Sequence, residues 1–166
     1  MKIRDFSFLG DFFFSEYILK FLEEWIFVNG NRIIVHTLIK VNNKFLLTKR
    51  SSCETTYPEY WDIPGGLADY GELPREALVR ETREEIGLNI ILTMIIHEDS
   101  NYDESKDLIF IRLVYLCDLI DDIKNIKLQL EEHSEYRLIS SLDDLKDEKI
   151  SPFLFDLFNN DLKIKC

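Results

Sequence analysis

The sequence has few cysteines, no long apolar run and no signal-peptide pattern. The three cysteines are scattered and lack the spacing of a zinc site, so we expect unpaired thiols in a reducing environment. No apolar run reaches the roughly 18 residues that a membrane helix needs. Residues 1–20 are rich in aromatic side chains, but Asp5, Asp11 and Glu16 interrupt them, which predicts no secretory signal. We therefore expect a cytoplasmic protein that does not enter a membrane.

Basic residues are also in the minority. The chain carries 20 Lys and Arg against 31 Asp and Glu, which gives a formal net charge of −11. This balance opposes binding to the long phosphate backbone of a nucleic acid. It does not oppose a small phosphorylated substrate whose charge is carried in by metal ions. With 166 residues, 46% of them hydrophobic, the chain is long enough for one globular domain with a sizeable core.

Apolar patterns and turn signals predict a mixed α and β fold. Five segments rich in apolar residues are predicted as strands: residues 32–41, 44–50, 89–97, 107–119 and 136–139. A tight turn at Asn42-Asn43 is expected to join the first two. Residues 98–106 are interpreted as a polar connection. A closing helix is predicted at residues 153–158, because Pro152 suits a first helical turn.

The beginning of the chain is less regular. Ser15 is a candidate cap for a helix at residues 16–25, and Asn29-Gly30 is a turn signal. We interpret residues 1–30 as an N-terminal extension. It is expected to pack on the main domain, residues 31–166, or on a second subunit, which would make a homodimer.

The densest functional signal lies at residues 66–88, which read GLADYGELPREALVRETREEIGL. Pro74 marks the first turn of a predicted helix and Gly87 marks its end. Between them, Glu81, Glu84 and Glu85 stand at i, i+3 and i+4, so they share one helix face. Three carboxylates on one face repel one another unless cations neutralise them, and hard oxygen ligands suit Mg²⁺ or Mn²⁺. The spacing therefore predicts a divalent-metal site.

This stretch resembles the signature of the Nudix (MutT-like) hydrolase family. The signature positions are filled by Gly66, Glu72, Arg80, Glu81, Glu84, Glu85, Gly87 and Leu88. Thr82 departs from it, because the family prefers an aliphatic side chain there, and this questions the local packing rather than the chemistry. The resemblance implies an α/β/α sandwich with a mixed sheet. It also implies that the signature stretch, residues 66–88, which we call the box, forms a loop-helix-loop. The sequence pattern alone indicates only a mixture of α and β.

The resemblance also implies a site. Glu81, Glu84 and Glu85 are expected to hold Mg²⁺ or Mn²⁺, with the carbonyl of Gly65 as a further ligand. Either Glu84 or Glu85 is a candidate general base. Arg80 is expected to support the site by pairing with Glu84, four residues further along the helix.

Residues outside the box complete the list of candidates. The family often carries an additional catalytic or metal-binding Glu just before a later strand; Glu132 fits that spacing best, and Glu131 and Glu135 are alternatives. Arg50, at a strand end, either contacts substrate phosphates or is a solvated charge. Trp61 is interpreted as a core or loop anchor. Glu148 lies in an acidic stretch outside the signature, and Glu148→Gln is expected to change turnover little.

The leading functional hypothesis is a metal-dependent pyrophosphohydrolase. It would cleave a phosphoanhydride bond in a nucleoside diphosphate linked to another moiety, and nucleoside triphosphates, sugar nucleotides and dinucleotides all remain open as substrates. The main alternative is a non-catalytic nucleotide sensor of the same fold, although such modules commonly lose box acids and this chain keeps them. A prenyl diphosphate isomerase is a third reading, but residues 61–66 resemble the hydrolase version.

Overall fold

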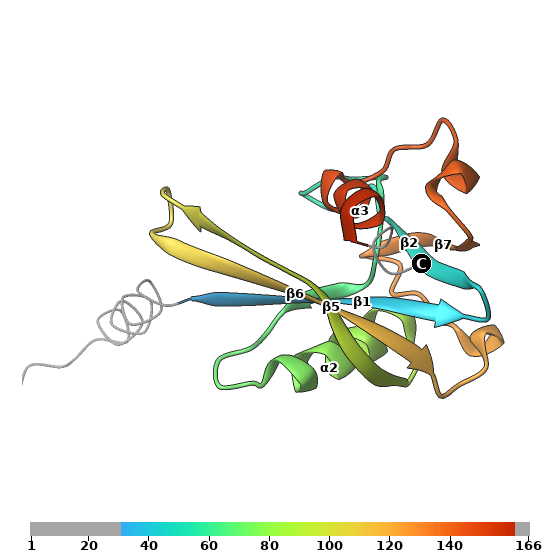
Figure 1. Cartoon of the computed structure of the whole chain (residues 1–166), viewed down its shortest axis with the longest axis horizontal. Helices are drawn as coiled ribbons and strands as arrows, with labels where there is room; N and C mark the ends of the chain where they lie inside the picture. The colour runs from blue at the N-terminus through green and yellow to red at the C-terminus, as the bar shows by residue number, and fades with distance from the viewer. Residues whose placement is uncertain (1–30, 162–166) are drawn as a thin grey trace, which may run out of the picture.

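Two segments rich in Ile, Leu and Val form the hairpin that opens the described part of the chain, residues 31–161 of this computed structural model (Figure 1). β1 (Arg32–Val41) and β2 (Lys44–Arg50) pair antiparallel with Val41 opposite Lys44, so the predicted hairpin is confirmed. Asn42 turns the chain at a φ of 55°, a left-handed conformation that Asn tolerates better than most residues. The predicted N-terminal extension and its helix lie outside the described residues.

The described residues form one mixed sheet of seven strands. Its other strands are β3 (Trp61–Asp62), β4 (Gly65–Leu67), β5 (Ile90–Asp103), β6 (Leu108–Leu119) and β7 (His133–Ile139). The main path across the sheet is β3-β2-β1-β6-β5, while β4 pairs with β1 and β7 pairs with β2. β1 and β6 are parallel, and the other pairs are antiparallel. The first half of β1 is therefore paired on both edges, by β4 and by β6.

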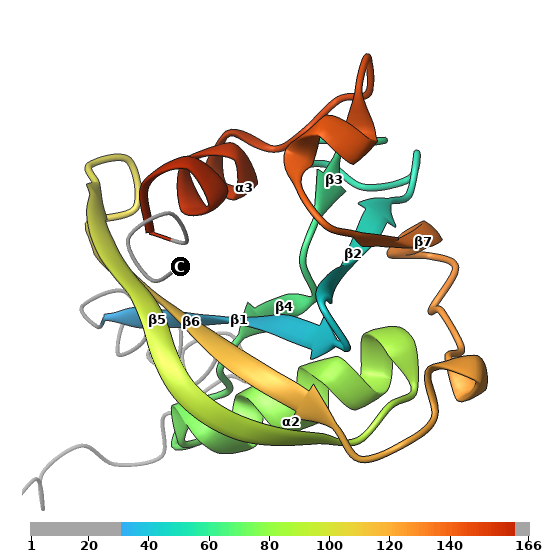
Figure 2. The same ribbon diagram turned by 45° about the vertical axis from the view of Figure 1, so that its right-hand side comes forward.

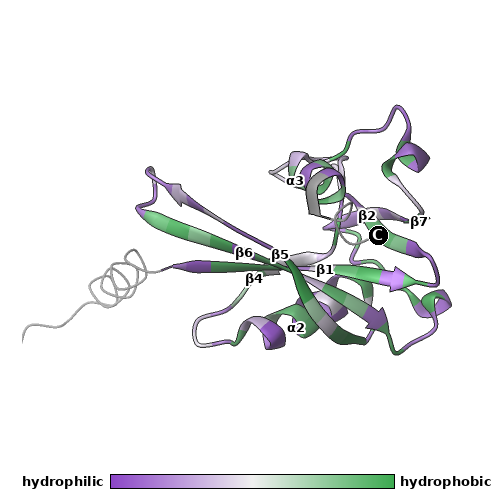
Figure 3. Ribbon diagram, viewed as in Figure 1, coloured by the Kyte–Doolittle hydropathy of each residue, from purple (hydrophilic) through white to green (hydrophobic). Residues whose placement is uncertain are grey.

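The long hairpin of β5 and β6 corrects one expectation. The polar connection predicted over residues 98–106 is wrong as far as Asp103, because β5 continues beside β6 with Tyr102 opposite Ile109. Figure 3 shows why the sequence was misleading: the end of β5 is hydrophilic, whereas the start of β6 beside it is hydrophobic. Polar residues can continue a strand when the partner strand supplies the ladder of backbone hydrogen bonds. β7 likewise begins at His133, earlier than predicted.

Helices cover both faces of the sheet, so the expected α/β/α sandwich is confirmed (Figure 2). α2 (Pro74–Ile86) lies on one face, and α3 (Pro152–Asp156) with the π-helical turn η3 (Leu157–Asp161) lies on the other. Two short 3₁₀ turns, η1 (Ile123–Asn125) and η2 (Leu142–Leu145), lie in the connections. Among the described residues, no helix is long and apolar enough to cross a membrane.

α2 begins and ends where its sequence predicts. Pro74 occupies the first turn, where its missing N–H is not needed, and the Glu76 carboxylate accepts the N–H of Leu73 at 3.3 Å. Gly87 ends the helix at a φ of 70°, and its N–H donates to the carbonyl of Arg83. Glycine adopts this left-handed conformation without the steric cost of a Cβ atom. The helix is thereby fixed at both ends beside β4.

Thr82 is buried in the packed face of α2 because a second hydroxyl meets it. Its Oγ1 donates to the carbonyl of Leu78 at 2.7 Å and lies 2.8 Å from Oγ1 of Thr37 on β1. Both threonines are fully buried. A buried hydroxyl without a partner is costly, but each of these hydroxyls has one. The departure from the aliphatic pattern is therefore accommodated by a residue on the neighbouring strand.

Trp61 anchors the opposite face, as predicted, and it contacts Glu148. The fully buried indole donates from Nε1 to the Glu148 carboxylate at 2.6 Å. Arg137 and Lys49 bind the same carboxylate at 2.7 Å and 3.3 Å. The hydrogen bond from Trp61 lowers the pKa of Glu148. Replacing Glu148 would therefore disturb a buried indole N–H and two cations, so Glu148 is an unsuitable control position, while the expectation that Glu148→Gln changes turnover little stays a prediction.

We predict that Thr82→Val destabilises the fold by about 1–3 kcal/mol, because it leaves the Thr37 hydroxyl buried without its partner. Urea unfolding followed by circular dichroism would measure the loss. In a double-mutant cycle, Thr37→Val combined with Thr82→Val should be less destabilising than the sum of the two single changes. Strict additivity would contradict the coupling.

Candidate active site

A single guanidinium organises the acids of the box. Arg80 binds both carboxylate oxygens of Glu72, at 2.9 Å and 2.8 Å. Its Nη1 reaches Glu81 at 2.8 Å and Glu84 at 3.0 Å, and its Nη2 donates to the carbonyl of Leu67 at 3.1 Å. The predicted pairing with Glu84 is present, but Glu72 is the bidentate partner. Arg80 lowers the pKa of Glu72 to about 2, so this pair is charged at neutral pH.

Two glycines bring the box loop close to the helix. A Cβ atom on Gly66 would lie 2.6 Å from the Glu81 carboxylate, and one on Gly65 would lie 2.0 Å from the backbone oxygen of Val35. Gly65 also has a φ of 151°, which side chains disfavour. The backbone contact leaves no room for a side chain at Gly65, and a side chain at Gly66 would displace the Glu81 carboxylate. The N–H of Gly65 donates to Oε2 of Glu85 at 3.0 Å.

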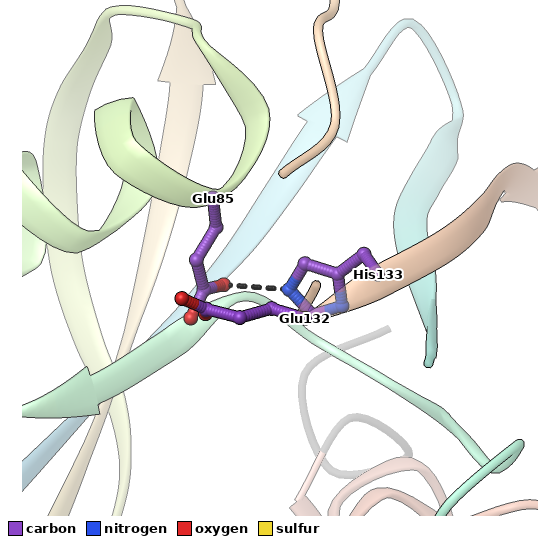
Figure 4. A group of neighbouring side chains, drawn as sticks. All are labelled: Glu85, Glu132 and His133. Atoms are coloured by element: carbon purple, nitrogen blue, oxygen red, sulfur yellow. Dashed lines mark hydrogen bonds and ion pairs between the residues drawn. The ribbon is translucent and has the colours of Figure 1, made fainter. Parts of the chain in front are cut away.

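The deepest part of the site joins α2 to the start of β7. Glu85, Glu132 and His133 each offer one ligand atom, and these atoms all lie within 4.8 Å of one another (Figure 4). Glu85 and His133 are each 4% exposed, and Oε2 of Glu85 lies 2.9 Å from Nε2 of His133. Backbone bonds fix the approach, because Gln129 donates to the carbonyl of Glu85 at 2.8 Å. The structure thus places Glu132 beside the box acids.

The other two loop candidates lie elsewhere. Glu131 is exposed, and Glu135 forms an ion pair with Arg137 at 3.0 Å. Sequence reasoning missed His133, although a histidine directly after the candidate acid and at the head of a strand was a usable signal. The signal was not used because the strand was predicted to begin at residue 136, whereas β7 begins at His133 itself.

The box acids share one side of α2 as expected, but they differ in burial. Glu85 is buried, Glu81 is 14% exposed and Glu84 is 59% exposed at the rim. Burial raises the pKa of Glu85 to about 8. Burial is also the main cause that raises the pKa values of Glu81 and Glu132, and neighbouring carboxylates add to it. Arg80 partly compensates Glu81, whereas Glu85 and Glu132 form no ion pair with Lys or Arg among the described residues.

Histidine does not supply a positive charge to Glu85 and Glu132 either. Burial lowers the pKa of His133 to about 4, so its ring is neutral at physiological pH. A neutral ring that donates from Nε2 to Glu85 leaves Nδ1 as an acceptor, and Nδ1 is buried without a hydrogen-bond partner among the described residues. Without a cation, burial favours the protonated forms of these carboxylates. Carboxylates together with a neutral imidazole are ligands that suit a divalent cation. The residues present fit such an ion.

Arg50 lies at the edge of this site. Its Nε donates to the carbonyl of Thr56 at 2.7 Å, and its Nη2 forms an ion pair with Glu54. It is therefore not the simple solvated charge of the alternative reading. It is close enough to act electrostatically on Glu85 and His133. A contact with substrate phosphates stays a prediction.

One family profile and several known proteins are similar to this chain. The profile of the NUDIX domain matches residues 30–160. The nucleoside triphosphatase NudI of Escherichia coli strain K12 is 32% identical over 121 residues, which cover 68% of this chain and 84% of that protein. The crystal structure of the MutT protein from Methanosarcina mazei Go1 is 29% identical with a TM-score of 0.65, covering 83% of this chain and 98% of that one. A MutT NUDIX hydrolase from Burkholderia pseudomallei, 21% identical with a TM-score of 0.62 over 75% and 93% of the two chains, supports the fold alone.

We predict that Arg80→Lys weakens divalent-cation binding about 10- to 100-fold, because an ammonium cannot bind Glu72 bidentately and reach Glu81 and Glu84 as well. Titration calorimetry with Mn²⁺ would measure the affinity. Arg83→Lys is the matched control on the same helix, since the Arg83 guanidinium donates to the Asn89 side chain and forms no ion pair with an acid of residues 31–161. Equal affinities in both variants would contradict the organising role of Arg80.

Proposed function

Because this chain belongs to the Nudix family and is a Nudix hydrolase, we propose that it is a pyrophosphohydrolase of nucleoside triphosphates that depends on Mg²⁺ or Mn²⁺. The observation that carries the proposal is the group of buried Glu85 and His133 with half-buried Glu132, next to a complete set of box acids. A nucleotide-sensing module would have no need to keep Glu132 beside Glu85. The triphosphate substrate rests on the similarity to NudI over most of its length.

The acids of the site differ in burial, and we assign their roles on that basis. Glu81, Glu85 and Glu132, with the carbonyl of Gly65, would hold the divalent cation, and His133 would fix the orientation of Glu85. When bound, such an ion neutralises phosphate charge, orients the substrate and acidifies a water molecule. Glu84 stands outside this group at the open rim, tied to Arg80. It is placed to serve ions or phosphates that arrive with the substrate.

Proton transfer falls to Glu132. It is only partly buried, so water can reach it, whereas Glu85 is enclosed by Gly65 and His133. Glu132 would take a proton from the attacking water while the water oxygen bonds to phosphorus. The phosphoanhydride bond then breaks, and its electron pair leaves with the pyrophosphate oxygen. The products are a nucleoside monophosphate and pyrophosphate. Glu84 is the alternative base.

Two further parts of the proposal concern the substrate and the compartment. Arg50 is assigned to the substrate phosphates, because it carries a permanent charge in a planar fork at the edge of the acid cluster. Cys53 and Cys117 are free thiols, which supports a reducing, cytoplasmic environment. Small nucleotides rather than long nucleic acids are the proposed partners, in line with the net charge of −11.

We predict that activity requires millimolar-scale Mg²⁺ or Mn²⁺ and that EDTA abolishes it. Glu84→Gln, Glu85→Gln and Glu132→Gln should each lower turnover about 10²-fold or more, since each removes a charge that acts in the transition state. Glu132→Gln should also lose the acidic limb of the pH–rate profile if Glu132 is the base. Pyrophosphate release would report all of these rates.

Glu104→Gln is the matched control for these variants. Glu104 is exposed in the turn between β5 and β6, and it has none of the contacts that make Glu148 unsuitable. Its turnover should stay within about twofold of the wild type. Near-normal turnover of Glu85→Gln at limiting Mg²⁺, with Glu104→Gln also normal, would refute the metal site on α2.

We predict that nucleoside triphosphates are the best substrates. A panel of ribo- and deoxynucleoside triphosphates, sugar nucleotides and dinucleotides, with mass spectrometry of the products, would compare kcat/KM. A nucleoside monophosphate and pyrophosphate should form fastest from a triphosphate. A faster reaction with a sugar nucleotide or a dinucleotide would agree with the hydrolase activity but would contradict the proposal that triphosphates are the substrates.

A further inference from the structure

One cation lies beside the acid cluster without forming an ion pair with its acids. Arg50 ends β2 and acts electrostatically on both Glu85 and His133. Within residues 31–161, its guanidinium nevertheless forms no ion pair with Glu85 or Glu132. It pairs instead with Glu54, four residues further along the chain. The choice of this partner needs an explanation, because two uncompensated carboxylates are close by.

The loop that follows β2 builds this pairing from local contacts. The Ser51 hydroxyl accepts the N–H of Cys53 at 2.9 Å, and the Ser51 carbonyl accepts the N–H of Glu54 at 3.3 Å. This turn brings the Glu54 carboxylate back to the Arg50 guanidinium, whose Nε donates to the carbonyl of Thr56 at 2.7 Å. Both contacts to the guanidinium therefore come from the loop, and neither comes from the acid cluster.

The base of the same loop is joined to the acid cluster. Ser51 is 3% exposed, and its N–H donates to the carbonyl of Glu132 at 2.7 Å. The N–H of Arg50 donates to the carbonyl of Tyr60 at 2.8 Å, and the carbonyl of Arg50 accepts the N–H of Glu59 at 3.2 Å. The backbone of Arg50 is thus fixed one residue away from the attachment to Glu132. The direction of its side chain then decides which acid the guanidinium contacts.

A guanidinium that turned toward the cluster would compete with a divalent cation. Arginine keeps its charge at physiological pH, and its attraction to a buried carboxylate is stronger than in water because the local dielectric constant is lower. An ion pair with Glu85 would occupy the carboxylate oxygens that the cation needs. The Arg50 and Glu54 side chains are each 24% exposed, so their pair lies where an arriving phosphate can reach it.

We propose that Glu54 is a positioning residue that holds Arg50 away from the acid cluster and so keeps Glu85 and Glu132 open to a divalent cation. The inference rests on the metal site of the proposed function and deepens it, because it gives a role to an acid outside the box. Glu54 needs no contact with the ion. Arg50 stays at the edge of the cluster, where it is assigned to substrate phosphates, without taking the ligands of the cation.

Titration calorimetry of the EDTA-treated, full-length protein with Mn²⁺ tests the proposal. Glu54→Gln removes the charge that holds Arg50 and should weaken Mn²⁺ binding about 10-fold or more, as is usual when an outer partner of a metal site is lost. Arg50→Ala alone should not weaken binding, since it removes a nearby positive charge. The double variant should bind Mn²⁺ within about twofold of Arg50→Ala, because Glu54 has no arginine left to hold.

Glu59→Gln is the matched control in the same loop. It removes the same charge, but Glu59 pairs with Lys149, at 3.6 Å, rather than with Arg50. Its Mn²⁺ affinity should stay within about twofold of the wild type, since an exposed ion pair contributes little. The double variant also controls for folding. If Glu54→Gln acted by unfolding the loop, removing Arg50 as well would not restore the affinity.

Two results would overturn the inference and leave the metal site intact. One is a Mn²⁺ affinity of Glu54→Gln within about twofold of the wild type. The other is an equal loss from Glu54→Gln with and without Arg50, which would mean that Glu54 only attracts the cation through space. Absence of Mn²⁺ binding by the wild type would instead overturn the metal site of the proposed function, and the role of Glu54 with it.

Discussion

The structure depends on the burial of one carboxylate. Glu85 is 4% exposed, and its Oε2 lies 3.0 Å from the N–H of Gly65 and 2.9 Å from Nε2 of His133. Glu85, Gly65 and His133 come from α2, β4 and β7, respectively. This arrangement requires three elements. Gly65 must bring its backbone N–H close to Glu85, α2 must carry Glu85, and β7 must place His133 beside it. Much of the local architecture follows from meeting these requirements together.

The acids around α2 carry negative charge that must be compensated, and the two sides of the helix differ in how this is done. On the outer side of α2, Arg80 neutralises Glu72 and contacts Glu81 and Glu84, so that half is satisfied by the protein's own charge. On the inner side, Glu85 and Glu132 form no ion pair with a Lys or Arg of residues 31–161, and burial favours their protonated forms. Such an arrangement is unfavourable in the absence of a cation and becomes favourable when one binds. Functional sites commonly retain groups that reduce stability in this way.

Local sequence signals predicted the elements that are determined by residues close together in the sequence. The hairpin of β1 and β2 and the limits of α2 follow from turn residues, Pro74 and Gly87, and they agree with the structure. The Glu85–His133 contact joins residues 48 positions apart and depends on the pairing of β7 with β2, which no local pattern encodes. The same holds for Glu148 under Trp61 and for the polar end of β5, where a partner strand overrides composition.

The central claim is that the buried acids form the divalent-cation site, and paramagnetic broadening by Mn²⁺ tests it most directly. In amide NMR spectra of the full-length protein, substoichiometric Mn²⁺ should first broaden the signals of Gly65, Gly66, Glu85 and His133. Gly71, in the open part of the loop, and Glu148, on the opposite face under Trp61, should stay sharp at the same Mn²⁺ ratio. Broadening that begins elsewhere, or equal broadening of all these amides, would contradict the account.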